Sequence, residues 1–493
     1  MTSRRWTAAL AALACSVVLS AQSVVPAVPA LPRSVDQLRH DIDAILGSPL
    51  LQHGLWGVVV KPVDRDETWY SKNGNTLMMP ASTLKVVTLA VAAERLGWDF
   101  RFETKLFAVG TVSGGTLHGD LVVVGSGDPS LDDWDGNATQ VFGDWATRLK
   151  AAGITAIDGR IVGDDHAFEA EKIGAGWAWD DLPAGFAAGV GALQFNEGNA
   201  QLRLAPGDAV GDKAIVTISP DFAGLTLKNM IVTGPPDSVG NVTRRRLPGS
   251  SRLELRGSLP LRGRPYSQTV SVDNPTRYFV NALRAALLAD GIAITGPAVD
   301  IDDLPSPPSR DHIAPLITYQ SPPLSMLATT MMKLSQNQFA EALFKTIGGG
   351  TAEGARMAQR DTLQSWGIDP STVILADGSG LSRYNYVAPE TMVDVLTHVF
   401  RSERLRTAYQ ATLPIAGRDG TLELRMKGTA AEGRAFVKTG SMNGVRTAAG
   451  YVQTADGQTL VFAIMANNFA NSPAVINAAT DEIIVRLASY RSR

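Results

Sequence analysis

Cysteine is almost absent from the sequence. Cys15 is the only one in 493 residues, and it lies inside an apolar stretch over residues 6–19. Disulfide bonds and thiol catalysis are therefore excluded from the rest of the chain. Histidine is scarce as well: the six histidines are at least 13 residues apart and form no His-Glu-x-x-His motif. We expect neither a metal nor another cofactor.

The sequence also lacks an excess of either charge. Its 45 basic and 48 acidic residues nearly cancel, which argues against nucleic-acid binding. After residue 19, no apolar run is long enough to span a bilayer. The sequence leaves the oligomeric state and peripheral contact with a membrane open.

The N-terminus resembles a secretory signal. Arg4 and Arg5 precede the apolar stretch over 6–19, and small residues and prolines follow it. This pattern predicts a signal peptide over residues 1–30 and export to the periplasm or to the cell-wall side of the membrane. The cleavage point is not defined, and an uncleaved anchor or a lipoprotein modified at Cys15 are the alternatives.

The sequence pattern changes twice along the chain. Short β-like runs separated by Gly, Asp and Pro fill residues 100–273, whereas helical patterns dominate on either side. The pattern predicts helices over 34–46, 86–96, 276–288, 324–334, 339–347, 357–366, 390–400 and 474–487, and strands over 55–63, 67–71, 292–299, 435–439, 447–453 and 459–465. An antiparallel sheet flanked by helices, to which both chain ends contribute, is an α+β fold.

Ser82 and Lys85 form the first chemical motif. They stand three residues apart at the start of the predicted helix, so the Lys85 amine can reach the Ser82 hydroxyl. Apolar neighbours would desolvate Lys85 and lower its pKa, which would make it a base for a serine nucleophile. Taken alone, such a pair is more often an N-cap serine with a solvated lysine.

Two further motifs follow in the C-terminal part. Ser335-Gln336-Asn337 offers a hydroxyl that relays a proton and an amide that holds a lysine or a carbonyl. Lys438-Thr439-Gly440 ends a predicted strand and offers a fixed charge, a hydroxyl and room for a substrate backbone. Alone, the first is an ordinary helix cap and the second a surface turn.

In this order, the three motifs resemble the set shared by penicillin-binding proteins and serine β-lactamases, with Gln336 in place of aspartate. Ser82 and Ser335 are 253 residues apart, which leaves room for inserted domains. With further landmarks at 119–121, 126–131, 176–181, 377–383 and 438–444, the chain resembles the D-alanyl-D-alanine carboxypeptidase/endopeptidase family, the low-molecular-mass class C penicillin-binding proteins.

The resemblance implies a penicillin-binding, serine β-lactamase-like transpeptidase domain built from residues 34–99 and 274–493. Residues 100–273 would form an inserted β-rich region of two small domains. The substrates would be peptidoglycan stem peptides, cleaved through an acyl-enzyme on Ser82, and β-lactam antibiotics would acylate the same serine.

The resemblance also implies roles for individual residues. Lys85 would be the base, and the remaining catalytic residues are Ser335, Asn337 and Lys438. Substrate-binding residues would be Thr439, Gly440, Ser441, Met442, Asp164 and Arg383, with Asp164 on a stem-peptide amine.

Two alternatives stay open: a β-lactamase or esterase on the same core, and a non-catalytic peptidoglycan-binding protein. The balance between carboxypeptidase and endopeptidase activity, and the diamino acid of the stem, are not fixed by the sequence. An α/β-hydrolase is not indicated, because the sequence has no Gly-x-Ser-x-Gly elbow.

Overall fold

The computed structural model describes residues 32–133 and 136–492. The predicted signal peptide over 1–30 lies outside the described residues. Helices and sheets are mixed along the chain, and the predicted α+β class is confirmed. Within the described ranges, no helix combines the length and the apolar character needed to cross a membrane.

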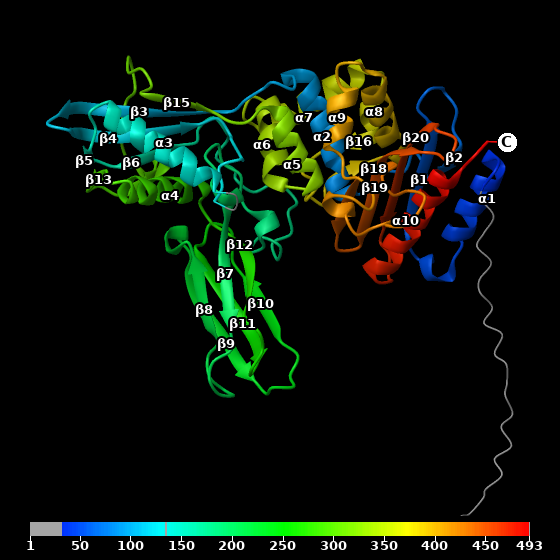
Figure 1. Cartoon of the computed structure of the whole chain (residues 1–493), viewed down its shortest axis with the longest axis horizontal. Helices are drawn as coiled ribbons and strands as arrows, with labels where there is room; N and C mark the ends of the chain where they lie inside the picture. Colours follow the sequence, from blue (N-terminus) through cyan, green and yellow to red (C-terminus); the bar gives the residue numbers. More distant parts are fainter. Residues whose placement is uncertain (1–31, 134–135, 493) are drawn as a thin grey trace, which may run out of the picture. The chain divides into compact units, whose positions relative to one another are not determined.

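A five-stranded antiparallel sheet is built from strands of both the N-terminal and the C-terminal part of the described chain. Its strand order is β18–β19–β20–β1–β2. The strands are β1 (Leu55–Pro62), β2 (Tyr70–Lys72), β18 (Ala435–Met442), β19 (Val445–Gln453) and β20 (Thr459–Asn467). Helices α1 (Val35–Leu46) and α10 (Pro473–Ser489) contact each other and share one apolar core with the sheet (Figure 1). The central strands are buried on both faces because helices cover each side.

The second helical layer packs against the sheet through another core. It contains α2 (Leu84–Leu96), α5 (Leu324–Lys333), α6 (Asn337–Ile347), α7 (Ala352–Ser365), α8 (Pro389–Arg401) and α9 (Arg406–Thr412), with the short pair β16 (Val373–Ile374) and β17 (Tyr386–Val387). Helix α2 lies at its centre, since all residues from Leu84 to Ala93 are buried. A helix that is apolar on every side is buried on every side.

Between α2 and α5 the chain forms a seven-stranded sheet. Its strands are β3 (Glu103–Ser113), β4 (Thr116–Gly125), β5 (Ala156–Ile157), β6 (Ile161–Asp164), β13 (Ala293–Ile294), β14 (Ala298–Asp300) and β15 (Ile317–Gln320). Helices α3 (Asn137–Ala151) and α4 (Pro275–Ala289) pack on it. Figure 1 shows both helices beside these strands.

Two three-stranded sheets extend from this region. One has the order β12–β7–β8, from β7 (Asn199–Ala205), β8 (Ile215–Ser219) and β12 (Tyr266–Ser271). The other has the order β10–β11–β9, from β9 (Thr226–Gly234), β10 (Asn241–Arg245) and β11 (Arg252–Pro260). Their apolar side chains join the core of the seven-stranded sheet.

Short 3₁₀ turns connect many of these elements. They are η1 (Pro49–Leu51), η2 (Ala81–Thr83), η3 (Gly185–Ala187), η4 (Asn196–Gly198), η5 (Asp221–Ala223), η6 (Ile301–Asp303), η7 (Pro370–Thr372) and η8 (Gly420–Leu422). Turn η2 carries Ser82 and leads directly into α2, so the candidate nucleophile of the first motif lies at a helix N-terminus.

The strand pairing after residue 273 shows that the boundary expected at residue 274 lies later in the chain. Strands β13, β14 and β15 pair with β5, β6 and β3, and α4 belongs to the same core. The chain therefore returns to the helical layer after β15, near residue 321 and not at 274. The single strand expected over 292–299 is in fact β13 and β14, which pair with different partners.

Leu283 on α4 tests the assignment of this helix to the core of the seven-stranded sheet. It is fully buried, whereas Leu288 on the same helix is 40% exposed. We expect Leu283→Ala to lower the free energy of unfolding by about 2–5 kcal/mol, since it removes buried methyl groups and leaves a cavity. Leu288→Ala should change it by about 0.5 kcal/mol or less. Denaturant unfolding of both variants measures the difference; equal effects would contradict the assignment.

Candidate active site

The backbone around Ser82 is enclosed by two glycine contacts. A Cβ on Gly440 of β18 would lie 2.9 Å from Ser82 N, and one on Gly380 would lie 1.9 Å from the Ala81 carbonyl oxygen. Gly380 also has φ +85°, which side-chain-bearing residues rarely adopt. These glycines let β18 and the loop over 377–383 lie directly against the serine.

Lys85 is fully buried and has three polar partners. Its Nζ lies 3.0 Å from Ser82 Oγ, 2.6 Å from Asn337 Oδ1 and 2.8 Å from the Ser379 carbonyl oxygen. Burial lowers the pKa of Lys85 to about 7, against the opposing field of Asp377 and Glu341. A substantial fraction of the lysine is therefore neutral near neutral pH.

The hydrogen-bond partners suit a neutral amine. Such an amine has two N–H groups and one lone pair. The Asn337 Oδ1 and Ser379 carbonyl oxygens can only accept, so they take both N–H groups. The lone pair then faces Ser82 Oγ, which is the arrangement a general base needs.

Ser335 and Lys438 form the second half of the cluster. Lys438 Nζ donates to Ser335 Oγ at 2.8 Å and to the Thr439 carbonyl oxygen at 2.7 Å. Burial and the nearby Lys85 charge hold the pKa of Lys438 well below its usual value. Ser335 lies between α5 and α6 with φ +62°. The helix-cap alternative is not supported, because α6 begins at an N-cap, Gln336, that makes no side-chain cap hydrogen bond.

Asn337 connects the motifs. Its Oδ1 accepts from Lys85, and its Nδ2 donates to the Phe186 carbonyl oxygen at 2.7 Å. Phe186 lies in η3, more than 150 residues earlier in the chain. The structure thus forms two hydrogen-bonded groups, Ser82–Lys85–Asn337 and Ser335–Lys438, and the Lys85 charge acts on Lys438 between them.

The predicted substrate-binding residues of β18 line its open edge. The first half of this edge strand is covered, since Val437 N donates to Pro414 and Ala416 N donates to Ala435. In the described parts of the chain, no such backbone partner continues alongside Thr439–Ser441. Thr439 Oγ1 donates to Thr421 Oγ1 at 2.9 Å, and Ser441 is exposed. This edge can pair with an extended peptide beside Ser82.

Arg383 lies near the end of the same strand. Its Nη2 donates to the Asn443 carbonyl oxygen, next to Met442, and its backbone N–H donates to the Gly176 carbonyl oxygen. Arg383 therefore ties the aromatic loop over 176–181 to the β18–β19 turn. The structure places Arg383 in contact with the residue that follows Met442.

Asp164 departs from expectation. It ends β6, is 3% exposed, and its carboxylate accepts from the Arg310 guanidinium at 2.5 Å and from the His166 backbone N–H at 3.0 Å. No hydrogen bond joins it to the serine–lysine cluster in the described residues. Its partners are internal, so the geometry gives no support to a contact with a substrate amine.

Sequence reasoning missed Glu341, Ser379 and Thr421. Ser379 lies inside the quoted 377–383 motif, but nothing marked its carbonyl as a lysine partner. Glu341 carried a usable signal: it is a single charge among apolar residues, four positions after Asn337 and hence on the same face of α6. Thr421 had no signal, because it reaches Thr439 only through the tertiary fold.

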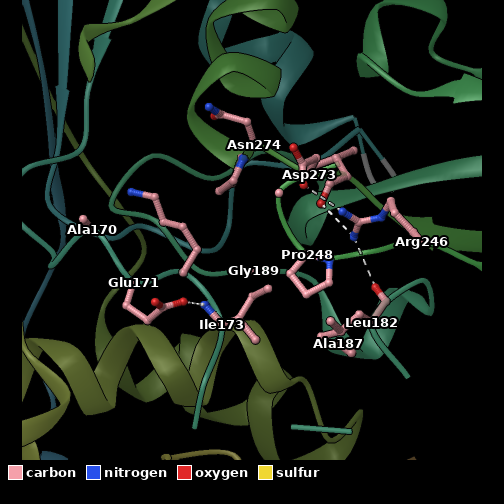
Figure 2. Close-up of a pocket in the computed structure, with 14 residues that line it drawn as sticks. Ala170, Glu171, Ile173, Leu182, Ala187, Gly189, Arg246, Pro248, Asp273 and Asn274 are labelled. Atoms are coloured by element: carbon pink, nitrogen blue, oxygen red, sulfur yellow. Dashed lines mark hydrogen bonds and ion pairs between the residues drawn. The ribbon is translucent and has the colours of Figure 1, made fainter. Parts of the chain in front are cut away.

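A polar cavity of about 250 Å³ lies beside the segment that carries Phe186. Figure 2 shows its lining, with Arg246 bonded to Asp273 and to the Leu182 carbonyl oxygen. Lys172, which also lines it, is paired with Asp165. Both cationic side chains already have protein partners, although Arg246 Nε makes no hydrogen bond within the described residues, so we assign the cavity no ligand.

Three carboxylates gather near this region. Oxygens of Asp165, Asp300 and Asp302 lie within 4.8 Å of one another. Asp165 also accepts from Thr276 and Lys172, and Asp302 accepts from His166. Acidic side chains gather in this way without a cation, and nothing further points to a metal.

The comparisons with known proteins agree over nearly the whole chain. The family model "D-Ala-D-Ala carboxypeptidase 3 (S13) family" matches residues 38–490. D-alanyl-D-alanine carboxypeptidase from Actinomadura sp. (strain R39) is 33% identical over 99% of this chain and 92% of its own length. D-alanyl-D-alanine carboxypeptidase DacB from Haemophilus influenzae is 30% identical over 84% of this chain and 85% of its own length.

Solved structures lead to the same family. The crystal structure of penicillin binding protein 4 (dacB) from Haemophilus influenzae matches with a TM-score of 0.79 and 28% identity. The match covers 91% of this chain and 98% of that one. The likeness confirms the predicted penicillin-binding, β-lactamase-like fold. Together with the family match, it shows that the chain belongs to the D-Ala-D-Ala carboxypeptidase 3 (S13) family.

Proposed function

We propose that the chain is a serine-type D-Ala-D-Ala carboxypeptidase whose nucleophile is Ser82. The observation that carries this proposal is the buried Lys85 amine, whose Nζ lies 3.0 Å from Ser82 Oγ and whose other two partners are uncharged oxygens. A serine hydroxyl attacks a peptide carbonyl efficiently only when a neighbouring base takes its proton. Family membership supplies the reaction class.

The first step forms an ester. Lys85 Nζ takes the proton of Ser82 Oγ as the oxygen attacks the carbonyl carbon of the penultimate D-Ala. Substrate backbone pairs with the open edge of β18, which directs the scissile carbonyl toward Ser82. Backbone N–H groups of Ser82 and Ser441 would bind the oxyanion, and the close approach of Gly440 to Ser82 N supports this placement.

The second part breaks the C–N bond. The leaving D-Ala nitrogen receives a proton through Ser335 Oγ, which is hydrogen-bonded to Lys438. The hydroxyls of Thr439 and Thr421 lie along the same edge and suit the terminal carboxylate. Water then hydrolyses the ester on Ser82, which returns the enzyme to its starting state.

Peptidoglycan stem peptides are the proposed substrates, and β-lactams the proposed covalent inhibitors. Both relatives named above are carboxypeptidases, and the solved Haemophilus protein has also been crystallised in complex with a β-lactam. A β-lactamase or esterase activity is not favoured by the family match. Analysis of the products released from pentapeptides and from cross-linked muropeptides separates carboxypeptidase from D,D-endopeptidase activity.

Export is a separate proposal. The basic, apolar and small-residue sequence over 1–30 supports a cleaved signal peptide and a site of action in the periplasm or on the cell-wall side of the membrane. N-terminal sequencing of the protein recovered from the producing cell tests it. An N-terminus at Met1 would contradict cleavage.

A covalent adduct tests the nucleophile. After incubation with benzylpenicillin, the protein should gain the mass of one penicilloyl group, and peptide mapping should place it on Ser82. Ser82→Ala should form no adduct and should release D-Ala at least roughly 10³-fold more slowly, because no other group can form the ester. Rapid turnover of benzylpenicillin without a lasting adduct would favour a β-lactamase instead.

The acylation rate should depend on pH through Lys85. Its pKa is lowered to about 7, and only the neutral amine can accept the Ser82 proton. The rate constant for benzylpenicillin acylation should therefore fall about tenfold per pH unit below about pH 7 and level off above it. Stopped-flow or quenched-flow measurements between pH 5 and 9 give the profile. A rate that is constant down to pH 5 would contradict Lys85 as the base.

A further inference from the structure

Glu341 is a buried carboxylate beside the proposed site that the mechanism above does not use. It lies on α6, four residues after Asn337, and is 4% exposed. Its Oε1 accepts from the backbone N–H of Gly378 at 3.1 Å and from that of Ser379 at 2.7 Å. Both contacts are to the loop that faces Lys85.

The Ser379 backbone links Glu341 to the base. Its N–H side is held through Glu341, while the Ser379 carbonyl oxygen accepts from Lys85 Nζ at 2.8 Å. The preceding carbonyl, of Gly378, accepts from Thr88 Oγ1 at 2.7 Å. Thr88 lies on α2, three residues after Lys85, so the loop is fixed from two helices at once.

The loop packs closely against α6. A Cβ on Gly378 would lie 2.4 Å from Phe344 Cβ and 2.8 Å from the Ala340 carbonyl oxygen, both on α6. The loop therefore lies directly against the helix that carries Glu341. A change in the acceptor at position 341 is transmitted to the Ser379 carbonyl.

The charges that face Lys85 are few. Asp377 and Glu341 are the acids that act on it, and Lys438 is the nearby cation. Asp377 is occupied by the backbone N–H groups of Gly380 and Ser382. Neither carboxylate forms an ion pair with the amine in the described residues, so both act on it through space.

We propose that Glu341 is a positioning residue for the base: it holds the Ser379 carbonyl that takes one N–H of Lys85, and its charge favours the protonated amine. The carbonyl fixes the direction of the lone pair toward Ser82. This inference rests on the proposed function, because it gives Lys85 the role of base. Burial and the Asp377 charge raise the pKa of Glu341.

Two substitutions separate the hydrogen-bonding role of Glu341 from the effect of its charge. Glu341→Gln keeps a side-chain oxygen that can accept from Gly378 and Ser379 but removes the charge. Glu341→Met has a similar length and removes both the acceptor and the charge. Leu343→Ala, also buried on α6, is the matched control for a loss of packing without a contact to the loop hydrogen bonds.

The measurement is the pH profile of benzylpenicillin acylation, with the rate at saturation and the concentration for half saturation recorded separately, beside the melting temperature. For Glu341→Gln we expect a plateau rate near that of the wild type and an acid limb moved to lower pH by at least about half a unit. For Glu341→Met we expect a plateau at least about tenfold lower, with half saturation little changed. Leu343→Ala should lower the melting temperature and leave the profile in place.

The outcomes are decisive in either direction. An unshifted acid limb in Glu341→Gln, or a wild-type plateau in folded Glu341→Met, would overturn the proposal. If Glu341→Met does not fold, the Glu341→Gln limb decides alone. Failure of the proposed function looks different, because the wild-type protein itself would then form no adduct on Ser82.

Discussion

The central constraint of this structure is a lysine amine with no access to water and no carboxylate in contact. Lys85 is completely buried, yet its partners in the described residues are the oxygens of Ser82, Asn337 and Ser379, none of which carries a charge. A direct ion pair would stabilise the ammonium and abolish the base. The two nearby acids are kept away from the amine because backbone N–H groups occupy them. The low pKa of Lys85 thus results from burial, which the two acids oppose only through space.

The second buried amine completes this electrostatic arrangement. Lys438 is also fully buried, and the two positive charges disfavour each other. Protonating both amines at once is costly, so a proton accepted by Lys85 raises the tendency of the Lys438–Ser335 pair to release one. The leaving nitrogen of the substrate is the natural recipient. A pair of lysines can in this way move a proton from nucleophile to leaving group without histidine.

Sequence reasoning recovered the cluster because its parts are short motifs whose order is informative. The spacing of Ser82 and Lys85 already places their side chains within reach of each other. Residues 335–337 and 438–440 indicate a catalytic site only when they occur together with that pair. The features that sequence reasoning did not predict depend on tertiary contacts. The pairing of β13, β14 and β15 with β5, β6 and β3 leaves no local pattern, so the predicted return to the helical layer at 274 was too early. Helix α3 was missed inside a region whose turns suggested only strands. Asp164 was assigned through resemblance, and its pairing with Arg310, 146 residues away, could not be read from the chain.

The region between α2 and α5 does more than extend the protein. The carbonyl oxygens of Phe186 and Ala188 accept from the side chains of Asn337 and Gln338, at the start of α6. Asn337 in turn gives Lys85 one of its two neutral acceptors. If this region were removed, the Asn337 amide would lose the contact that fixes its orientation, and a flipped amide would present a donor to Lys85 where an acceptor is required. The inserted chain therefore belongs to the hydrogen-bonded assembly around Lys85, the proposed base, so a long insertion between the first two motifs is compatible with a complete site.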